Sequence, residues 1–295
     1  MNLKHLRKLL PVFLVLFFVS CGSEKTEKED ESSIQTDTLP HKENIQKIFY
    51  SIPSPIQASL MLKKSGAQYA KEMVNPVENV NRYTTNFKKS VNMGAYGADL
   101  AYCNMFNQTQ EAIKFLSTVN KLSNSIGMSG IIERAGVLSR FQDNIGNKDS
   151  LMFILSDLFR ESDEYLKENE QYNTATYVLS GGWVEALYIA VMQAKKNNTK
   201  EMRQLIAEQK KSLNSLLNLL PPNPPEKEFG DFKSSLTALQ NVFADVSIET
   251  GESKVSTDPA TNVTTVDAEN KIGMTDQVFK NITDKIIAIR TELVK

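Results

Sequence analysis

The sequence predicts an all-α protein of about ten helices, arranged as antiparallel helical hairpins in a solenoid-like array or an irregular bundle. Two helix-start signals support this prediction, Ser54-Pro55-Ile56-Gln57 and Asn75-Pro76-Val77-Glu78. Each combines a capping residue, a proline at the first helical position and a Gln or Glu three residues after the cap. Apolar residues then recur at helical spacing through most of the chain, and persistent alternating runs are few.

The first signal predicts a helix, and we expect its apolar residues to share one face: Ile56, Leu60, Ala67, Ala70 and Met73. The second signal predicts a helix that carries Val77, Val80, Tyr83, Phe87 and Val91. Further helices are expected over 94–106, from about 107 to 126 before Gly127, and over 131–141. A turn over 143–148 follows.

Helical spacing resumes at Ser150 and continues over 174–195. Thr199 is the predicted cap of a long helix that ends at the proline-rich run 221–225, because proline cannot continue a helix. Asn223 can cap the next helix, and a last amphipathic helix is expected over 275–294. The intervening stretch 247–272 is rich in Thr, Ser, Asp and Val, which favours a mobile loop. The alternative is a loose hairpin that pairs 246–250 with 263–267.

The N-terminus has the three parts of a secretory signal: basic residues at Lys4, Arg7 and Lys8, an apolar run over 9–19, and small residues before a cysteine. Phe18-Val19-Ser20-Cys21 resembles the lipobox of bacterial lipoproteins, with phenylalanine in place of the usual leucine. The resemblance implies cleavage after Ser20, lipidation of Cys21 with palmitate, and an outer-membrane protein on the periplasmic or cell-surface face. The alternative is an uncleaved anchor, but the apolar run of 11 residues is shorter than the roughly 20 that span a bilayer.

We therefore divide the chain into a signal peptide over 1–20, a lipid anchor with a disordered acidic tether over 21–41, and an all-helical domain over 42–295. The tether is rich in Glu, Lys, Ser and Thr and cannot bury enough apolar surface to fold. Its charged block over 24–31 resembles the acidic export tethers of Bacteroidota surface lipoproteins; the alternative is a solvated spacer.

Composition excludes several function classes. Removal of the signal peptide would leave 31 basic residues against 35 acidic ones, so nucleic acid is not an expected partner. The two histidines, His5 and His41, both precede the helical domain, which argues against a Ser-His-Asp triad, a Cys-His pair and histidine-ligated zinc. Nucleotide-binding and nucleophile motifs are missing as well, so we expect no cofactor, metal or catalytic residue. Cys103 lies in an apolar stretch and is expected to be a buried small side chain.

Two stretches, 94–100 and 181–187, align at an offset of 87 residues, with glycine on glycine and Tyr96 on Trp183. They resemble the helical hairpins of tetratricopeptide-like solenoids, although the full repeat signature is missing; ordinary helix packing in a bundle is the alternative. In a curved stack the inner helices would line a groove with Tyr96, Asp99, Tyr102, Trp183, Glu185 and Tyr188. The competing interpretation places these aromatic residues in the core and leaves the carboxylates in solvent.

These features together predict a lipid-anchored envelope protein that binds or scaffolds and does not catalyse. Its expected partners are the membrane, through Cys21, and another envelope protein or a small exported ligand. The alternative is a carboxylate-only hydrolase acting on envelope or exported glycans, because chemistry that needs only two acidic side chains remains possible without histidine.

Overall fold

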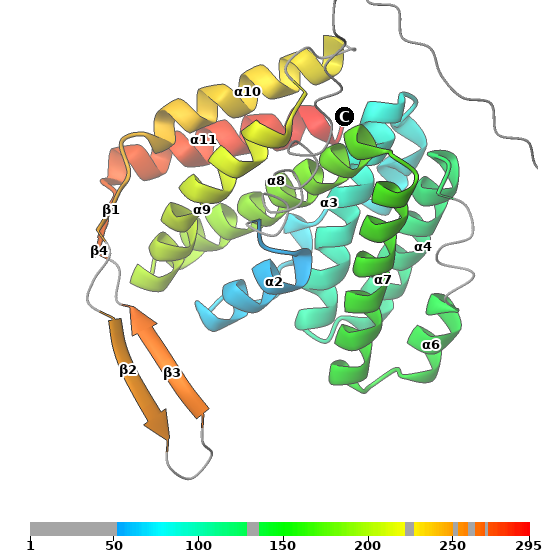
Figure 1. Cartoon of the computed structure of the whole chain (residues 1–295), viewed down its shortest axis with the longest axis horizontal. Helices are drawn as coiled ribbons and strands as arrows, with labels where there is room; N and C mark the ends of the chain where they lie inside the picture. Colours follow the sequence, from blue (N-terminus) through cyan, green and yellow to red (C-terminus); the bar gives the residue numbers. More distant parts are fainter. Residues whose placement is uncertain (1–51, 129–135, 222–226, 250–252, 259–262, 269–270) are drawn as a thin grey trace, which may run out of the picture. The chain divides into compact units, whose positions relative to one another are not determined.

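The computed structural model describes residues 52–128, 136–221, 227–249, 253–258, 263–268 and 271–295 (Figure 1). The predicted signal peptide, the lipidation site Cys21 and the tether lie outside these residues. Within them the predicted all-α class is confirmed, with short antiparallel strands near the C-terminus as the one addition.

The helices follow one another along the chain as α2 (Pro55–Lys64), η1 (Lys71–Met73), η2 (Val77–Arg82), α3 (Asn86–Met105), α4 (Thr109–Ser125), α6 (Val137–Asp143), α7 (Lys148–Glu168), α8 (Tyr172–Lys196), α9 (Lys200–Leu219), α10 (Lys227–Phe243) and α11 (Asp276–Leu293). Ser54 forms the predicted capping box, since its side chain accepts from the Gln57 N–H while the Gln57 side chain accepts from the Ser54 N–H. Thr199 caps α9 as predicted.

Two predicted helices differ from those observed. The first ends at Lys64 and does not continue to Met73, because Gly66 adopts a left-handed backbone conformation (φ 86°). Its buried residues are Ser59 and Leu62, whereas Leu60 is exposed. The second start signal produces only the short 3₁₀ helix η2, and the long helix α3 begins later at Asn86 with Thr85 as its cap. The expected separate helix over 94–106 is the second half of α3.

The stretch 247–272 contains strands where a loop was favoured. β1 (Ser247–Glu249) pairs with β4 (Lys271–Gly273), and β2 (Ser253–Asp258) pairs with β3 (Val263–Ala268), both antiparallel. The prediction of a loop is therefore wrong for these residues. The alternative hairpin had the correct kind of structure but the wrong partners, because Val263 faces Asp258 and not the 246–250 segment. β-Branched residues, which suit a pleated ladder, are frequent in β2 and β3.

The core is organised around α3 and α8, which make the most extensive helix contact in the described chain and lie in the middle of it (Figure 1). Their contacts advance in the same direction along both helices, from Val91 with Gly181 to Tyr102 with Gln193, so the two helices run parallel. These helices contain the two similar stretches. Gly94 of α3 touches the backbone of Val178 in α8, and Gly181 of α8 touches the backbone of Val91 in α3. The two contacts are equivalent, because Gly181 and Val178 lie 87 residues after Gly94 and Val91. The arrangement is an irregular bundle in which helices distant in sequence pack together.

Helix α8 is long and apolar enough to cross a membrane, with a mean hydropathy of 1.3. However, 72% of its most apolar 18-residue segment is buried inside the fold. It packs against α3, α9 and α11 and also contacts α7 and α2, which explains why apolar residues occur nearly all round it. Its hydropathy is that of a central core helix.

Candidate functional site

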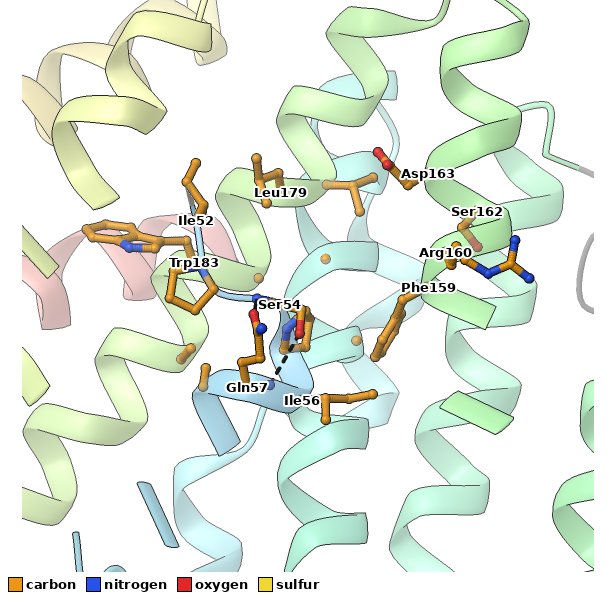
Figure 2. A pocket seen from close by; sticks show the side chains of 18 of the residues that line it. Ile52, Ser54, Ile56, Gln57, Phe159, Arg160, Ser162, Asp163, Leu179 and Trp183 are labelled. Atoms are coloured by element: carbon orange, nitrogen blue, oxygen red, sulfur yellow. Dashed lines mark hydrogen bonds between the residues drawn. The ribbon is translucent and has the colours of Figure 1, made fainter. Parts of the chain in front are cut away.

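A cavity of about 670 Å³ lies between α2, α3, α7, α8 and α9. Figure 2 shows Phe159 entering from α7 on one side and Trp183 on the other, with Ser54 and Gln57 at the start of α2 between them. The lining is mainly apolar, and several of its side chains keep exposed surface: Ile56, Met61, Phe159, Val178 and Leu179. Its volume falls within the range of roughly 300–1,000 Å³ that is usual for small-molecule sites.

Several polar groups in the cavity wall are already paired with one another. The Trp183 Nε1–H donates to Gln209 Oε1 at 3.1 Å. Ser54 and Gln57 satisfy each other in the capping box, and Asp163 accepts from Lys167. Because these groups have partners, the wall offers a ligand mostly apolar contact and shape.

The structure does not bring the six residues that were predicted to line a groove to one cavity or groove. Trp183 alone among them contributes to the cavity. Tyr96, Asp99, Tyr102 and Glu185 are fully buried, and Tyr188 packs under Arg290, whose guanidinium carbon lies 4.6 Å from the ring centroid. The competing interpretation was therefore correct for the buried tyrosines but wrong for the carboxylates, which lie in the core and not in solvent.

The buried tyrosines are held by their hydroxyl groups. Tyr96 donates to the Pro76 carbonyl at 2.8 Å. Tyr102 donates to the Gln68 carbonyl and accepts from the Ala70 N–H and from the Gln193 amide. Both rings thus fasten the segment between α2 and η2 onto α3, which is a structural role.

Asp99, Glu185 and Arg290 form a charged cluster in the core where α3, α8 and α11 meet. The guanidinium of Arg290 donates to both carboxylate oxygens of Glu185, at 3.0 Å from Nη2 to Oε1 and 3.1 Å from Nε to Oε2. Asp99 Oδ2 accepts from the Asn75 N–H at 3.1 Å, whereas Asp99 Oδ1 is buried and has no hydrogen-bond partner among the described residues. A carboxyl oxygen left without a donor in the core favours the neutral form of Asp99, since a buried carboxylate needs hydrogen bonds or a paired charge.

Burial and the charge of Glu185 raise the pKa of Asp99 well above its usual range. Burial also raises the pKa of Glu185, but the positive charge and the hydrogen bonds of the Arg290 guanidinium act in the opposite direction. With Asp99 neutral, Glu185 negative and Arg290 positive, the cluster has no net charge. This explains how two acidic side chains are accommodated in a core.

The raised pKa of Asp99 predicts a pH-dependent stability. In the unfolded chain Asp99 has a pKa of about 3.9, so above that pH the folded state binds more protons than the unfolded state. The contribution of Asp99 to the free energy of unfolding should therefore fall as pH rises from about 4 towards the folded-state pKa. Asp99→Asn keeps the neutral form, so its stability relative to the native protein should increase between about pH 4 and 8. Urea unfolding across that range, with Asp284→Asn as an exposed control, measures this difference. A difference independent of pH would show that the pKa of Asp99 is not raised in the folded protein.

Cys103 is buried as predicted, and burial raises the pKa of its thiol to about 12, which disfavours the nucleophilic thiolate form. No group of three or more His, Cys, Asp or Glu side chains suited to a metal ion occurs in the part of the chain that the structure describes. The apolar cavity is the strongest candidate for a functional site in that part.

Sequence reasoning missed most of this cavity. Phe159 appeared only as one apolar residue in the periodic pattern of α7, and Ile56 as a core residue of α2. The available signal was an excess of apolar residues: α7 carries Phe159 beyond its buried positions, such as Leu155 and Leu158, and α2 carries Ile56 beside Leu62. Which of these residues face a cavity depends on how α2 lies against α7, α8 and α9, and spacing along one helix contains no information on that.

The fold and the cavity define an all-helical protein with an apolar pocket beside a glycine-packed pair of central helices. No protein family, curated protein or solved structure matches this chain.

Proposed function

We propose that this protein is a lipid-anchored envelope protein whose helical body binds a small exported ligand with a large apolar part, or an apolar side chain of an envelope protein, without catalysis. The cavity between α2, α7, α8 and α9 is the observation that supports this proposal. An apolar surface of this kind gains free energy at roughly 25 cal/mol for each Å² that a ligand removes from water.

The position of the cavity in the fold suits a binding role. Helices α3 and α8 line one side of the cavity, and their glycines bring the two backbones into close contact. Helices α2 and α7, which line other sides, make few contacts with each other. A ligand that enters between α2 and α7 would leave the contact between α3 and α8 in place.

The anchor is part of the proposal and depends on residues 18–21, which resemble a lipobox. It would hold the binding domain at the outer membrane, on the periplasmic or cell-surface face. Radiolabelled palmitate should enter the native protein in cells and fail to enter the Cys21→Ala variant. Equal absence of label from both proteins would remove the anchor from the proposal.

The alternative, a carboxylate-only hydrolase acting on glycans, has less support. The acidic residues described in the cavity wall, Asp163, Glu164 and Glu168, all belong to α7. Glycoside hydrolysis uses two carboxyl groups on opposite sides of the bond. Asp99 and Glu185 are close together, but both are buried and neither lines the cavity.

Binding is tested with N-phenyl-1-naphthylamine, a neutral apolar fluorophore. Trp183 is the only tryptophan in the chain and lines the cavity, so energy transfer from it detects fluorophore bound to the protein near this site, and a variant that fills the cavity localises the binding. We expect saturable transfer in the native protein. Ala186→Phe should abolish it, because this half-buried residue of α8 lines the cavity and the larger side chain would fill it.

The matched control is Ala238→Phe, at a half-buried alanine of α10 outside the cavity. This variant should bind the fluorophore as the native protein does. Thermal unfolding of both variants establishes that they are folded. Saturable transfer that persists in Ala186→Phe would place binding elsewhere, and the absence of transfer in the native protein would contradict the proposed function.

A further inference from the structure

We infer that the cavity selects an amphiphile with a hydrocarbon body and one ammonium head group over the same body with a carboxylate head group. The inference rests on the proposed function and names the charge class of the ligand for the same site. The hydrocarbon body follows from the apolar lining, in which Trp183, Ser54 and Gln57 already have hydrogen-bond partners within the wall. The charge of the head group follows from the ionisable residues that border the cavity.

Arg160, one of the two cations in the described wall, is neutralised by carboxylates of its own helix. Its Nη1 lies 2.9 Å from Glu164 Oε2. Its Nη2 lies 3.7 Å from Asp157 Oδ1 and 3.7 Å from Glu161 Oε1. Figure 2 shows the guanidinium pointing away from Phe159, which lines the cavity. A carboxylate in the cavity would therefore gain little from Arg160.

The other border residues of α7 leave an excess of negative charge. Lys167, the second cation of the described wall, has a side chain that is only 13% exposed and is paired with Asp163. Glu168 is exposed, lines the cavity and has no cationic partner among the described residues. It is also the last residue of α7, where the helix dipole adds partial negative charge. An ammonium group can pair with Glu168 and leave both existing ion pairs of the wall intact.

The start of α2 is the one border feature that would favour an anion, because a helix N-terminus carries partial positive charge. Its backbone donors are largely used within the capping structure. Pro55 has no N–H group, and the N–H groups of Gln57 and Ala58 donate to the side chain and the carbonyl of Ser54. This helix start therefore offers an anion little to offset repulsion by the carboxylates of α7.

The test compares dodecylammonium with dodecanoate, two probes of equal chain length that carry opposite charges at pH 7. Each is titrated, below its critical micelle concentration, into the full mature chain with Cys21→Ala and bound N-phenyl-1-naphthylamine. Loss of energy transfer from Trp183 measures displacement of the fluorophore. We expect dodecylammonium to displace it at about tenfold lower concentration than dodecanoate, because one probe is attracted to Glu168 and the other is repelled.

Glu168→Lys should remove or reverse this preference, since the exposed position accommodates lysine and the new charge attracts dodecanoate. Asp143→Lys is the matched control. Asp143 is an exposed carboxylate at the last position of helix α6, as Glu168 is of α7, but it lies outside the cavity. This control should keep the native preference for dodecylammonium. Binding of the neutral fluorophore by both variants establishes that the cavity is intact.

Equal potency of the two probes on the native protein, or a preference for dodecanoate, would overturn the inference while the proposed function stands. The same holds if Glu168→Lys and Asp143→Lys change the preference equally, or if neither probe displaces the bound fluorophore. Absence of fluorophore binding in the native protein is a different result: it would refute the proposed function, and the inference with it.

Discussion

Replacing Gly181 by alanine is expected to destabilise the protein by about 3 kcal/mol or more. A Cβ atom at this position would lie 1.7 Å from the carbonyl oxygen of Val91. The clash is with backbone in the middle of α3, so no side-chain rotation can relieve it and the two helices must separate. Gly94→Ala should have a similar effect, because its Cβ would lie 1.8 Å from the Val178 oxygen. Urea denaturation followed by circular dichroism measures the loss, provided that the slope with denaturant is unchanged.

Gly97→Ala is the matched control for this prediction. Gly97 is a buried glycine of the same helix as Gly94, but its Cβ would lie 3.5 Å from Phe159 Cε1, which is ordinary contact. Alanine favours a helix interior over glycine by up to about 1 kcal/mol, so this variant should be as stable as the native protein or slightly more stable. A loss for Gly181→Ala no larger than that for Gly97→Ala would show that α3 and α8 do not approach as closely as described.

Replacing Arg290 by methionine is expected to cost about 3–5 kcal/mol, because it leaves the charge of Glu185 buried without a partner. Glu185 is fully buried and Arg290 is only 13% exposed, so water cannot replace the guanidinium without opening the core. The C-terminal helix α11 should be the first part to detach, since Arg290 joins it to α8. Hydrogen exchange of α11, together with urea denaturation, measures both effects.

Lys280→Met on the same helix is the control, since Lys280 and its partner Asp284 are both well exposed. Exposed pairs of this kind contribute less than about 1 kcal/mol. Adding Glu185→Gln to Arg290→Met should recover part of the loss by removing the unpaired charge. If Arg290→Met costs no more than Lys280→Met, the cluster is not a stabilising element of the core.

The local signals in the sequence located most helices but not all of their boundaries. Caps at Ser54, Thr199 and Thr275 begin helices where the sequence placed them, because each side chain satisfies an N–H group of the first turn. The signal at Asn75 failed as a long-helix start. Its backbone N–H donates to Asp99 in the core, and its side-chain amide donates to the Tyr83 hydroxyl, so this residue serves tertiary contacts.

The similarity of the stretches 94–100 and 181–187 predicted only part of their packing. Glycine aligns with glycine in the two stretches, and in the structure Gly94 and Gly181 each touch the backbone of the other helix. That the two stretches pack against each other, and not each against its own neighbour, could not be predicted from their similarity. The groove assigned to Asp99 and Glu185 failed for the same reason, since their carboxyl groups meet in the core through a pairing of helices distant in sequence.

By itself the sequence determined the helical class, the main helix starts and the absence of histidine from the helical domain. All of these are properties of single residues or of neighbours within a few turns, for which spacing and side-chain chemistry are sufficient. Only the tertiary structure decided that α3 pairs with α8, that Arg290 neutralises Glu185, and that α2 leaves an apolar cavity against α7, α8 and α9. Those features depend on which side chains meet after about a hundred intervening residues, and the free energy of such contacts is defined only when both partners are in place.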